Sequence, residues 1–206
     1  MSDIVAVIDF ETTGLSPAHG ARATEIAAVI VENGCIVDRY QSLMNAGVRI
    51  PTDIEAFTGI TNAMIRQAPS ADAVMEAVAD FVGDYPLVAH NAAFDSKFWD
   101  AELARIGLAR QQGFTCSLLL SRRIFPDAPS HRLESLIRHL HLPVSGRFHR
   151  ALADAEMTAG LLGRLREEFC RQHAYPDAPF EIFEHAQKIP VRKLGAFVAD
   201  ARRKAR

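Results

Sequence analysis

Four acidic residues and one histidine, spread over three segments of the chain, have types and spacings that suit metal-ion chemistry. Asp9 and Glu11 stand two residues apart, Asp95 lies near the middle, and His149 and Asp154 stand five residues apart. Carboxylates gathered at one point repel each other, and burying unpaired ions costs several kcal/mol each. Divalent cations relieve this repulsion, and once bound they can act on phosphate esters.

The first acidic pair follows a short apolar run, Ile4–Ile8, which has the composition of a buried central strand. Residues i and i+2 of a strand point to the same face, so Asp9 and Glu11 would reach one spot at the strand's end. Their oxygens suit Mg²⁺ or Mn²⁺. In isolation, two solvated loop acids are the simpler explanation. The following Thr12-Thr13-Gly14 favours a site, because hydroxyls and a permissive glycine allow close approach of a sugar or phosphate.

Asp95 falls in the first turn of a predicted helix, where the helix dipole favours a carboxylate. Plain helix capping therefore competes with a role in a site. His90 and Asn91 end the predicted strand Leu87–Ala89, and polar groups there should line a crevice. We interpret Asn91 as an orienting hydrogen-bond partner and His90 as structural.

His149 and Asp154 precede or open the longest helical pattern. Five residues correspond to about 500° of helix rotation, which leaves the two about 140° apart. They share a face only if His149 lies before the helix, and Gly146 makes such an approach plausible. A histidine that titrates near neutrality suits a general base. A surface histidine is the plainer interpretation of this segment alone.

The elements that position these residues form an ordered pattern. Ile4–Ile8, Ala27–Val31 and Cys35–Leu43 read as a three-strand meander, with a type I′ turn signal at Asn33-Gly34. Helices and strands then alternate, which indicates a mixed sheet with helices on both faces. Residues 51–68 are expected to be irregular or short-helical. The later elements are predicted at Ala71–Val82, Leu87–Ala89, Ala93–Ile106, Phe114–Ser117 with a helix running on to Ile124, Leu133–Leu140 and Ala151–Phe169.

Length and composition fit one domain. The chain has 206 residues, 49% of them hydrophobic, and a net charge of −2. The net charge is not positive and so does not by itself indicate nucleic-acid binding. A phosphate-binding site would need local basic patches and cations. We expect a domain over residues 1–175 and a C-terminal appendage over 176–206. The appendage is basic at its end, Arg202–Arg206, either to contact nucleic acid or as a solvated helix end.

Compartment signals are few. The three cysteines are far apart, so reduced and mostly buried thiols are expected. The first apolar run is too short for a signal peptide or a membrane span. The sequence therefore predicts a soluble, cytoplasmic protein that makes no contact with a membrane.

Together, the three segments resemble the DEDDh group of DnaQ-like 3′–5′ exonucleases, a branch of the RNase H-like superfamily. The matching motifs are Asp9-x-Glu11-Thr-Thr-Gly, His90-Asn91-Ala-x-Phe94-Asp95 and His149-x-Ala-x-x-Asp154-Ala. The resemblance extends over about residues 3 to 170 and follows the histidine rather than the tyrosine subgroup. It implies an α/β, RNase H-like fold with a mixed five-stranded sheet, a three-strand antiparallel meander plus parallel strands.

The resemblance also implies roles for the five residues. Two Mg²⁺ or Mn²⁺ ions would bind in each active site, with Asp9 bridging both. Glu11 and Asp154 would complete the ligands on the side of the attacking water, and Asp95 would serve the other ion. His149 would deprotonate the attacking water, and the product would be a nucleoside 5′-monophosphate.

A place for the 3′-terminal nucleotide beside the first motif is implied as well. Thr12 would contact its 3′-hydroxyl and Leu15 would wedge against its base. Gly14 and Asn91, already singled out above, are also expected to bind substrate. Two aromatic side chains could stack on the terminal nucleotides, as aromatic faces do in single-strand sites. These are Phe57 and Phe98, which are equally credible as core residues, and the core interpretation is preferred for Phe57.

The expected partners are 3′ ends of single-stranded DNA or RNA. DNA and a proofreading role like that of the polymerase III ε subunit are preferred, and RNA or oligoribonucleotide trimming is the alternative. Gln187-Lys-Ile-Pro-Val is a poor match to a sliding-clamp peptide, which argues against docking on a clamp or a polymerase and leaves a polymerase subunit as one candidate partner. A non-catalytic binding module is disfavoured, because every acid and the histidine are present.

Overall fold

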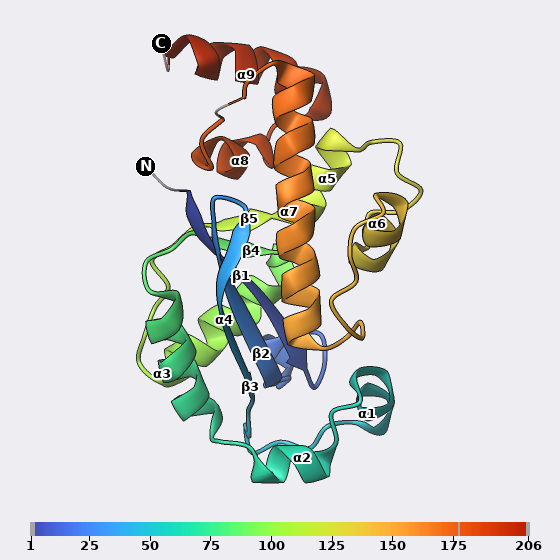
Figure 1. Cartoon of the computed structure of the whole chain (residues 1–206). Helices are drawn as coiled ribbons and strands as arrows, with labels where there is room; N and C mark the ends of the chain where they lie inside the picture. The colour runs from blue at the N-terminus through green and yellow to red at the C-terminus, as the bar shows by residue number, and fades with distance from the viewer. Residues whose placement is uncertain (1–2, 177, 205–206) are drawn as a thin grey trace.

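A five-stranded sheet forms the centre of the computed structural model, which describes residues 3–176 and 178–204 (Figure 1). The strand order is β3-β2-β1-β4-β5. Neighbours in the β1-β2-β3 meander are antiparallel, whereas β4 runs parallel to β1 and β5 parallel to β4. The predicted mixed sheet is confirmed. The strands are β1 (Ile4–Thr12), β2 (Ala23–Glu32), β3 (Cys35–Leu43), β4 (Leu87–Ala89) and β5 (Phe114–Cys116).

Two strands run further than the sequence predicted. β1 continues past Ile8 to Thr12, and β2 begins at Ala23 rather than Ala27. The alternation of faces explains the longer β1, because the buried Phe10 separates the two acids and keeps the period of two. At the β2–β3 turn, Asn33 and Gly34 have φ values of 50° and 82°, as a type I′ turn requires. A short 3₁₀ turn, η1 (Pro17–His19), lies between β1 and β2.

Alternate residues of β1 face two different cores. Ala6 and Ile8 belong to the core on one face, and Val5 and Val7 belong to the core on the other. The first face carries α3 (Ala71–Val82) and α4 (Ala92–Arg105), and the second carries α5 (Ser117–Ile124), α6 (Leu133–His139) and α7 (Ala151–His173). Asp9 and Glu11 continue the series of Val5 and Val7, so they face the side of α7.

The region expected to be irregular or short-helical contains α1 (Thr52–Thr58) and α2 (Asn62–Gln67). Its side chains form a small core of their own around Ile50, Ile60 and Ile65. Figure 1 shows both helices beyond the end of the sheet at which α7 begins. This arrangement places α1 beside the N-terminal end of α7.

The C-terminal segment contains α8 (Glu181–Ala186) and α9 (Val191–Lys204), at the other end of α7 (Figure 1). Phe183 and Leu194 belong to the same core as α7. Gln187 accepts a hydrogen bond from the backbone N–H of Cys116 at 2.7 Å and donates one to the carbonyl of Phe114 at 2.9 Å. Its side chain therefore occupies part of the free edge of β5, where an unpaired strand would otherwise invite association.

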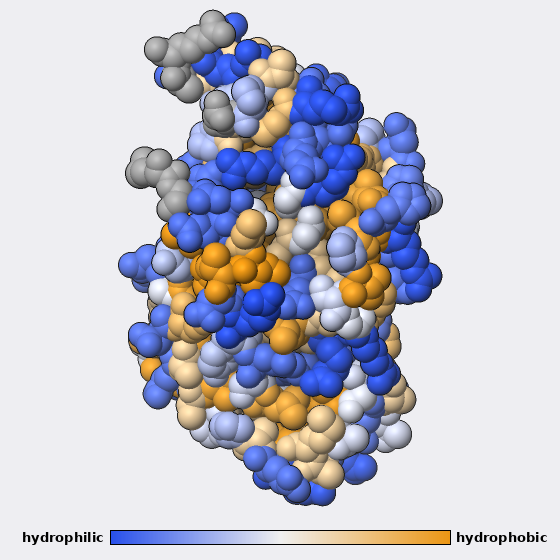
Figure 2. Space-filling view, in the orientation of Figure 1, coloured by the Kyte–Doolittle hydropathy of each residue, from blue (hydrophilic) through white to orange (hydrophobic). Residues whose placement is uncertain are grey.

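The surface turned to the viewer is mostly hydrophilic over α7, α8 and α9, with apolar side chains in separate patches lower down (Figure 2). Within the described residues all three cysteines are free; Cys116 is buried, Cys170 is partly buried and Cys35 is exposed at the hairpin. The basic end of the chain is described as far as Lys204, and residues 205–206 lie outside the described part.

Candidate active site

Asp9 and Glu11 lie inside β1 rather than beyond its end, which corrects the predicted boundary. β2 still pairs with the strand there, with Asp9 opposite Ala27 and Glu11 opposite Glu25. On the other side β4 stops early, because its last paired residue with β1 is Val88, opposite Val7. The two acids therefore stand where one flank of β1 has lost its neighbouring strand and a crevice opens.

Asp95 reaches this crevice from the first turn of α4. Asn91, with a φ of 72°, turns the chain from β4 into the helix. The Asp95 carboxylate accepts a hydrogen bond from the backbone N–H of Phe10 at 3.3 Å. It thus takes a ladder position that β4 leaves unfilled, and the interaction fixes Asp95 between the two acids of β1.

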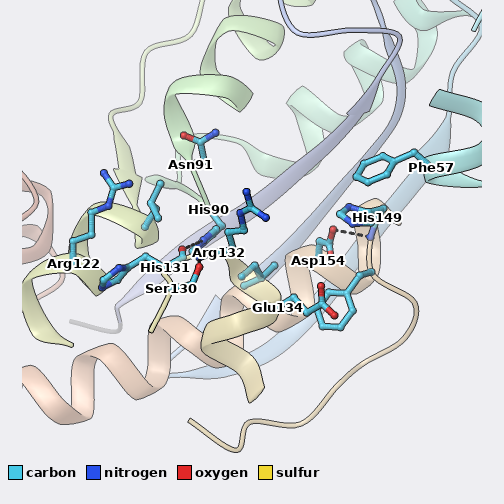
Figure 3. Close-up of a pocket in the computed structure, with 13 residues that line it drawn as sticks. Phe57, His90, Asn91, Arg122, Ser130, His131, Arg132, Glu134, His149 and Asp154 are labelled. Carbon is cyan, nitrogen blue, oxygen red and sulfur yellow. Dashed lines mark hydrogen bonds between the residues drawn. The ribbon is translucent and has the colours of Figure 1, made fainter. Parts of the chain in front are cut away.

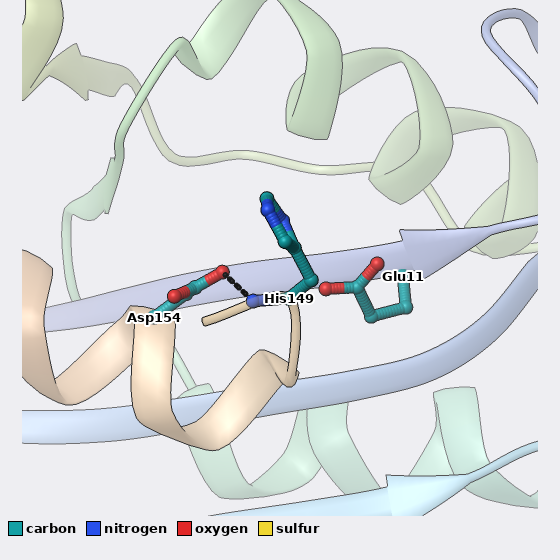
Figure 4. Close-up of side chains that lie close together, drawn as sticks. All are labelled: Glu11, His149 and Asp154. Atoms are coloured by element: carbon teal, nitrogen blue, oxygen red, sulfur yellow. Dashed lines mark hydrogen bonds between the residues drawn. The ribbon is translucent and has the colours of Figure 1, made fainter. Parts of the chain in front are cut away.

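His149 precedes α7, as the sequence predicts, and is held back against that helix's first turn. Its φ is 63°, and its backbone N–H donates to Oδ2 of Asp154 at 3.1 Å (Figure 4). Figure 4 shows the imidazole standing clear of the helix, with the Asp154 and Glu11 carboxylates on either side of its backbone. The ring of His149 stacks on Phe57 of α1, with centroids 3.9 Å apart. Three distant segments therefore meet at one point.

A buried ion pair from β2 positions the start of α7. The Glu25 side chain is fully buried and accepts hydrogen bonds from Arg150 at 2.7 and 3.1 Å and from the backbone N–H of Ala151 at 3.1 Å. The side chain of Arg150, at the N-cap of α7, forms no capping hydrogen bond itself. Glu25 was not among the residues singled out from the sequence. A glutamate in the otherwise apolar run of β2 was the signal that could have indicated its role.

The four carboxylates raise one another's pKa values. Burial, then the charges of Asp154, Glu25 and Asp95, raise the pKa of Glu11 to about 8. Burial likewise raises the pKa of Asp95 to about 7 and that of Asp154 to about 6. The pKa of Asp9 lies well above its usual range, because it is buried and faces Asp95 and Asp154. Near neutral pH such a cluster binds either protons or cations.

The donor set fits a divalent metal ion. Possible ligand atoms of Glu11, His149 and Asp154 lie within 4.8 Å of one another. Oδ1 of Asp154 is buried and has no hydrogen-bond partner among the described residues. A buried carboxylate oxygen without a partner is costly unless it binds a cation. The hard oxygen ligands therefore match Mg²⁺ or Mn²⁺ chemistry.

The residues expected to bind substrate divide into two groups. Leu15 is 86% exposed and Phe57 is 54% exposed, so both are available to a ligand. The preferred core interpretation of Phe57 is wrong, because the residue belongs to α1 at the surface and not to the sheet. Thr12 is buried and donates its hydroxyl to the carbonyl of Gly14 at 2.7 Å, which shapes the turn after β1.

Phe98 is not brought to the surface of the site. It has no exposed area and packs on Phe10 and Phe94 in the core beneath β1. The prediction that it contacts a nucleotide is therefore corrected: Phe98 supports the site from below. The helical position alone could not separate the two roles, since Phe94 and Phe98 lie one turn apart on α4.

A groove of about 690 Å³ passes over the site and extends beyond it (Figure 3). Asp154, His149 and Phe57 line one end, and Asn91 lies along its length. The sequence did not single out the basic residues that line the rest of the groove, which are Arg122, His131 and Arg132.

Within the described part of the chain, no helix combines the length and apolarity needed to cross a membrane.

Comparison with known proteins gives a consistent result. The profile of the RNase_T family, described as exonuclease, matches residues 6–162. DNA polymerase III PolC-type of Bacillus cereus is 36% identical over 163 residues, covering 79% of this chain and 11% of that protein. The 3′-5′ exonuclease DinG of Bacillus subtilis is 38% identical over 174 residues, covering 82% of this chain and 18% of that protein. The chain thus spans less than a fifth of either relative.

Solved structures share the fold. Exonuclease X in complex with 5′ overhanging duplex DNA is 28% identical, with a TM-score of 0.66, covering 79% of this chain and 91% of that chain. The nuclease domain of 3′hExo, a DEDDh family member bound to rAMP, is 20% identical, with a TM-score of 0.71, and covers 82% of this chain and 94% of that chain. At that identity the second likeness is one of fold.

Proposed function

The chain belongs to the RNase_T family of exonucleases, and from this membership and the site geometry we propose that it hydrolyses the terminal phosphodiester at the 3′ end of single-stranded nucleic acid. The product would be a nucleoside 5′-monophosphate. One observation carries the proposal: Asp9, Glu11, Asp95 and Asp154 converge with His149 at a single crevice, although they come from three distant segments.

The carboxylates give this site its electrostatic character. Two Mg²⁺ or Mn²⁺ ions, held by Asp9, Glu11, Asp95 and Asp154, would stabilise the charge on the attacking and leaving oxygens. Asp95 is fixed by the N–H of Phe10, and Asp154 is fixed through Oδ2 by the N–H of His149, while its buried Oδ1 has no partner among the described residues. The ligands are thereby oriented before a substrate arrives, which is the condition for efficient electrostatic catalysis.

His149 would accept the proton of the attacking water at a ring nitrogen. Burial lowers the pKa of His149, opposed by the charge of Glu134 and reinforced by that of Arg147, which favours the neutral imidazole that can accept a proton. Its stacking on Phe57 restricts the ring orientation. A neutral imidazole within reach of a water oxygen is an effective general base.

DNA is the proposed substrate, and the names of the relatives support it. The PolC-type relative is described as a DNA polymerase and DinG as a 3′-5′ exonuclease. Exonuclease X was solved in complex with 5′ overhanging duplex DNA. Leu15 and Phe57, which are exposed, would contact the terminal base, and Thr12, Gly14 and Asn91 would lie around its sugar and phosphate. A polymerase partner is proposed on the same likeness to the PolC-type enzymes.

A degradation panel tests the proposal. Single-stranded DNA, single-stranded RNA, a duplex with a mismatched 3′ end and a dinucleotide are incubated with Mg²⁺ or Mn²⁺, and released nucleotides are identified by mass spectrometry. We expect nucleoside 5′-monophosphates, fastest from single-stranded DNA. Faster RNA cleavage would reverse the substrate assignment, and release from the dinucleotide alone would indicate a small-phosphodiester hydrolase.

Asp9→Ala is the matched control in this panel. Loss of the Asp9 carboxylate should abolish cleavage and weaken Mn²⁺ binding measured by calorimetry, because Asp9 lies at the centre of the cluster. Unchanged metal affinity contradicts its proposed bridging role. If the unaltered chain degrades none of the substrates with either metal, the catalytic proposal fails and a binding module is the better description.

A further inference from the structure

The groove over the active site has a second, basic end. Beyond the metal-ligating residues it is lined by Arg122 of α5 and by Ser130, His131 and Arg132, which precede α6. Figure 3 shows Arg122, Ser130 and His131 at the opposite end of the pocket from Phe57 and His149, with Arg132 between the two ends. An overall net charge of −2 makes such a local concentration of positive charge informative.

No ion pair or side-chain hydrogen bond within the described residues accounts for the positions of Arg122 and Arg132. Arg122 and Arg132 are exposed, and neither guanidinium forms an ion pair or hydrogen bond with any residue in 3–176 or 178–204. In contrast, Arg138 is paired with Glu134, the acidic residue of this part of the groove. The groove therefore presents two free guanidinium groups, whose fork geometry matches phosphate oxygens.

The loop that carries Arg132 is fixed to the strand that leads to the active site. Nε2 of His90, directly after β4, donates to the carbonyl of His131 at 2.9 Å, and Nδ1 lies 2.9 Å from the hydroxyl of Ser117. His131 in turn bonds through Nε2 to the carbonyl of Phe125 at 3.0 Å. Because β4 also leads into the helix of Asp95, one element sets both the basic end and the acidic end of the groove.

We propose that Arg122 and Arg132 bind the phosphate next to the scissile one on its 5′ side, so that the groove takes a strand with internal phosphates. The inference rests on the proposed function and specifies its substrate. The carboxylate cluster repels a polyanion, and metal ions bound there would neutralise the charge of the scissile phosphate alone. The adjacent phosphate then needs its own positive partner, which the basic end supplies.

A length series tests this inference. Unphosphorylated dT₂ contains the scissile phosphate only, whereas dT₃ and dT₉ contain one or more phosphates on its 5′ side. For Arg122→Ala and Arg132→Ala we expect kcat/KM on dT₃ and dT₉ to fall about tenfold each, mainly through KM. The loss on dT₂ should be at least several times smaller. Arg122→Lys and Arg132→Lys should recover part of the activity, since the charge remains and the fork is lost.

Arg203→Ala, on α9 at the far end of α7, is the matched control for loss of one charge. Anisotropy of fluorescein-labelled dT₉ with Ca²⁺ gives a second readout: affinity should fall in both arginine variants, with a salt slope smaller by about 0.7 per lost contact. Equal losses on dT₂ and dT₉, or unchanged dT₉ affinity, overturn the inference. An unaltered chain that cleaves no oligonucleotide overturns the proposed function instead, which keeps the two failures distinct.

Discussion

His149 has a backbone conformation that residues other than glycine rarely adopt, with a φ of 63°. Two contacts hold it there, the hydrogen bond from its N–H to Asp154 and the stacking of its ring on Phe57. This conformation separates the imidazole from the periodicity of α7. The ring can then stand over the carboxylates although it lies only five residues before Asp154 in the chain.

Replacing this histidine tests its role as the base. His149→Ala should lower kcat by about 10²- to 10⁴-fold, the usual contribution of a general base, and leave Mn²⁺ affinity nearly unchanged. Single-turnover cleavage and calorimetry measure the two quantities, with His185→Ala, at an exposed position of α8, as the control. A parallel loss of metal affinity would instead make His149 a ligand, and a near-normal rate would exclude it as the base.

The main site residues were predictable at this scale because residue type and spacing alone indicate their chemistry. The spacing of His149 and Asp154 required a non-helical approach, and the structure has one. The two phenylalanines were not separable. Phe57 is exposed and Phe98 is buried, and only the packing of α1 and α4 decides between them.

At the scale of elements, α7 is attached to β2 by the pair of Glu25 and Arg150. Glu25 is fully buried, whereas the Arg150 side chain is 34% exposed. The carboxylate also accepts the N–H of Ala151, so β2 supplies the cap that α7 lacks. This attachment determines where Asp154, in the next turn, points.

The unequal burial of the pair predicts unequal costs. Arg150→Gln leaves the fully buried Glu25 charge without its cationic partner, with only Gln41 and the Ala151 N–H to donate to it, and should destabilise the fold by about 3 kcal/mol. Glu25→Gln leaves a partly exposed arginine that water can solvate, so about 1 kcal/mol is expected. Urea unfolding followed by circular dichroism measures both, with Arg150→Lys as the charge-preserving control. Equal costs would show that burial does not set the energetics of this pair.

Most elements were predictable from periodicity, turn residues and caps; Ser70, for example, is a favoured N-cap residue type, and it accepts the Ala73 N–H at the start of α3. The attachment of α7 was not predictable, because it depends on the register that places Glu25 opposite Glu11. The packing of α8 and α9 onto the main core was equally hidden, since it requires knowing which face of α7 remains free.

At the scale of the whole molecule, the carboxylate cluster sets how stability depends on pH. Glu11, Asp95 and Asp154 have pKa values of about 8, 7 and 6 in the folded chain, against ordinary values of 4.5, 3.8 and 3.8. At pH values between the ordinary and the raised pKa values, the folded state binds more protons than the unfolded state. The stability that these three carboxyl groups contribute is therefore complete below about pH 4 and is lost as the pH rises through 6 to 8.

Thermal unfolding in EDTA should accordingly show a Tm that falls as the pH rises from about 5 to about 8.5. Excess Mn²⁺ should weaken or reverse this trend, because cations bind the deprotonated carboxylates. Asp9→Asn removes one member of the cluster and should flatten the EDTA profile while raising the Tm at high pH. A Tm in EDTA that rises over this range would contradict the electrostatic account of the site.

The hydrogen bond from the Phe10 N–H to Asp95 gives the molecule an internal probe. The chemical shift of an amide proton responds to the charge on its acceptor, so the Phe10 resonance should report the state of Asp95. In ¹⁵N–¹H spectra it should move with pH and with added Mg²⁺, while that of Val7, paired within the sheet, stays nearly fixed. Occupancy of the crevice could then be followed by magnetic resonance in solution, with neither turnover nor nucleic acid in the sample.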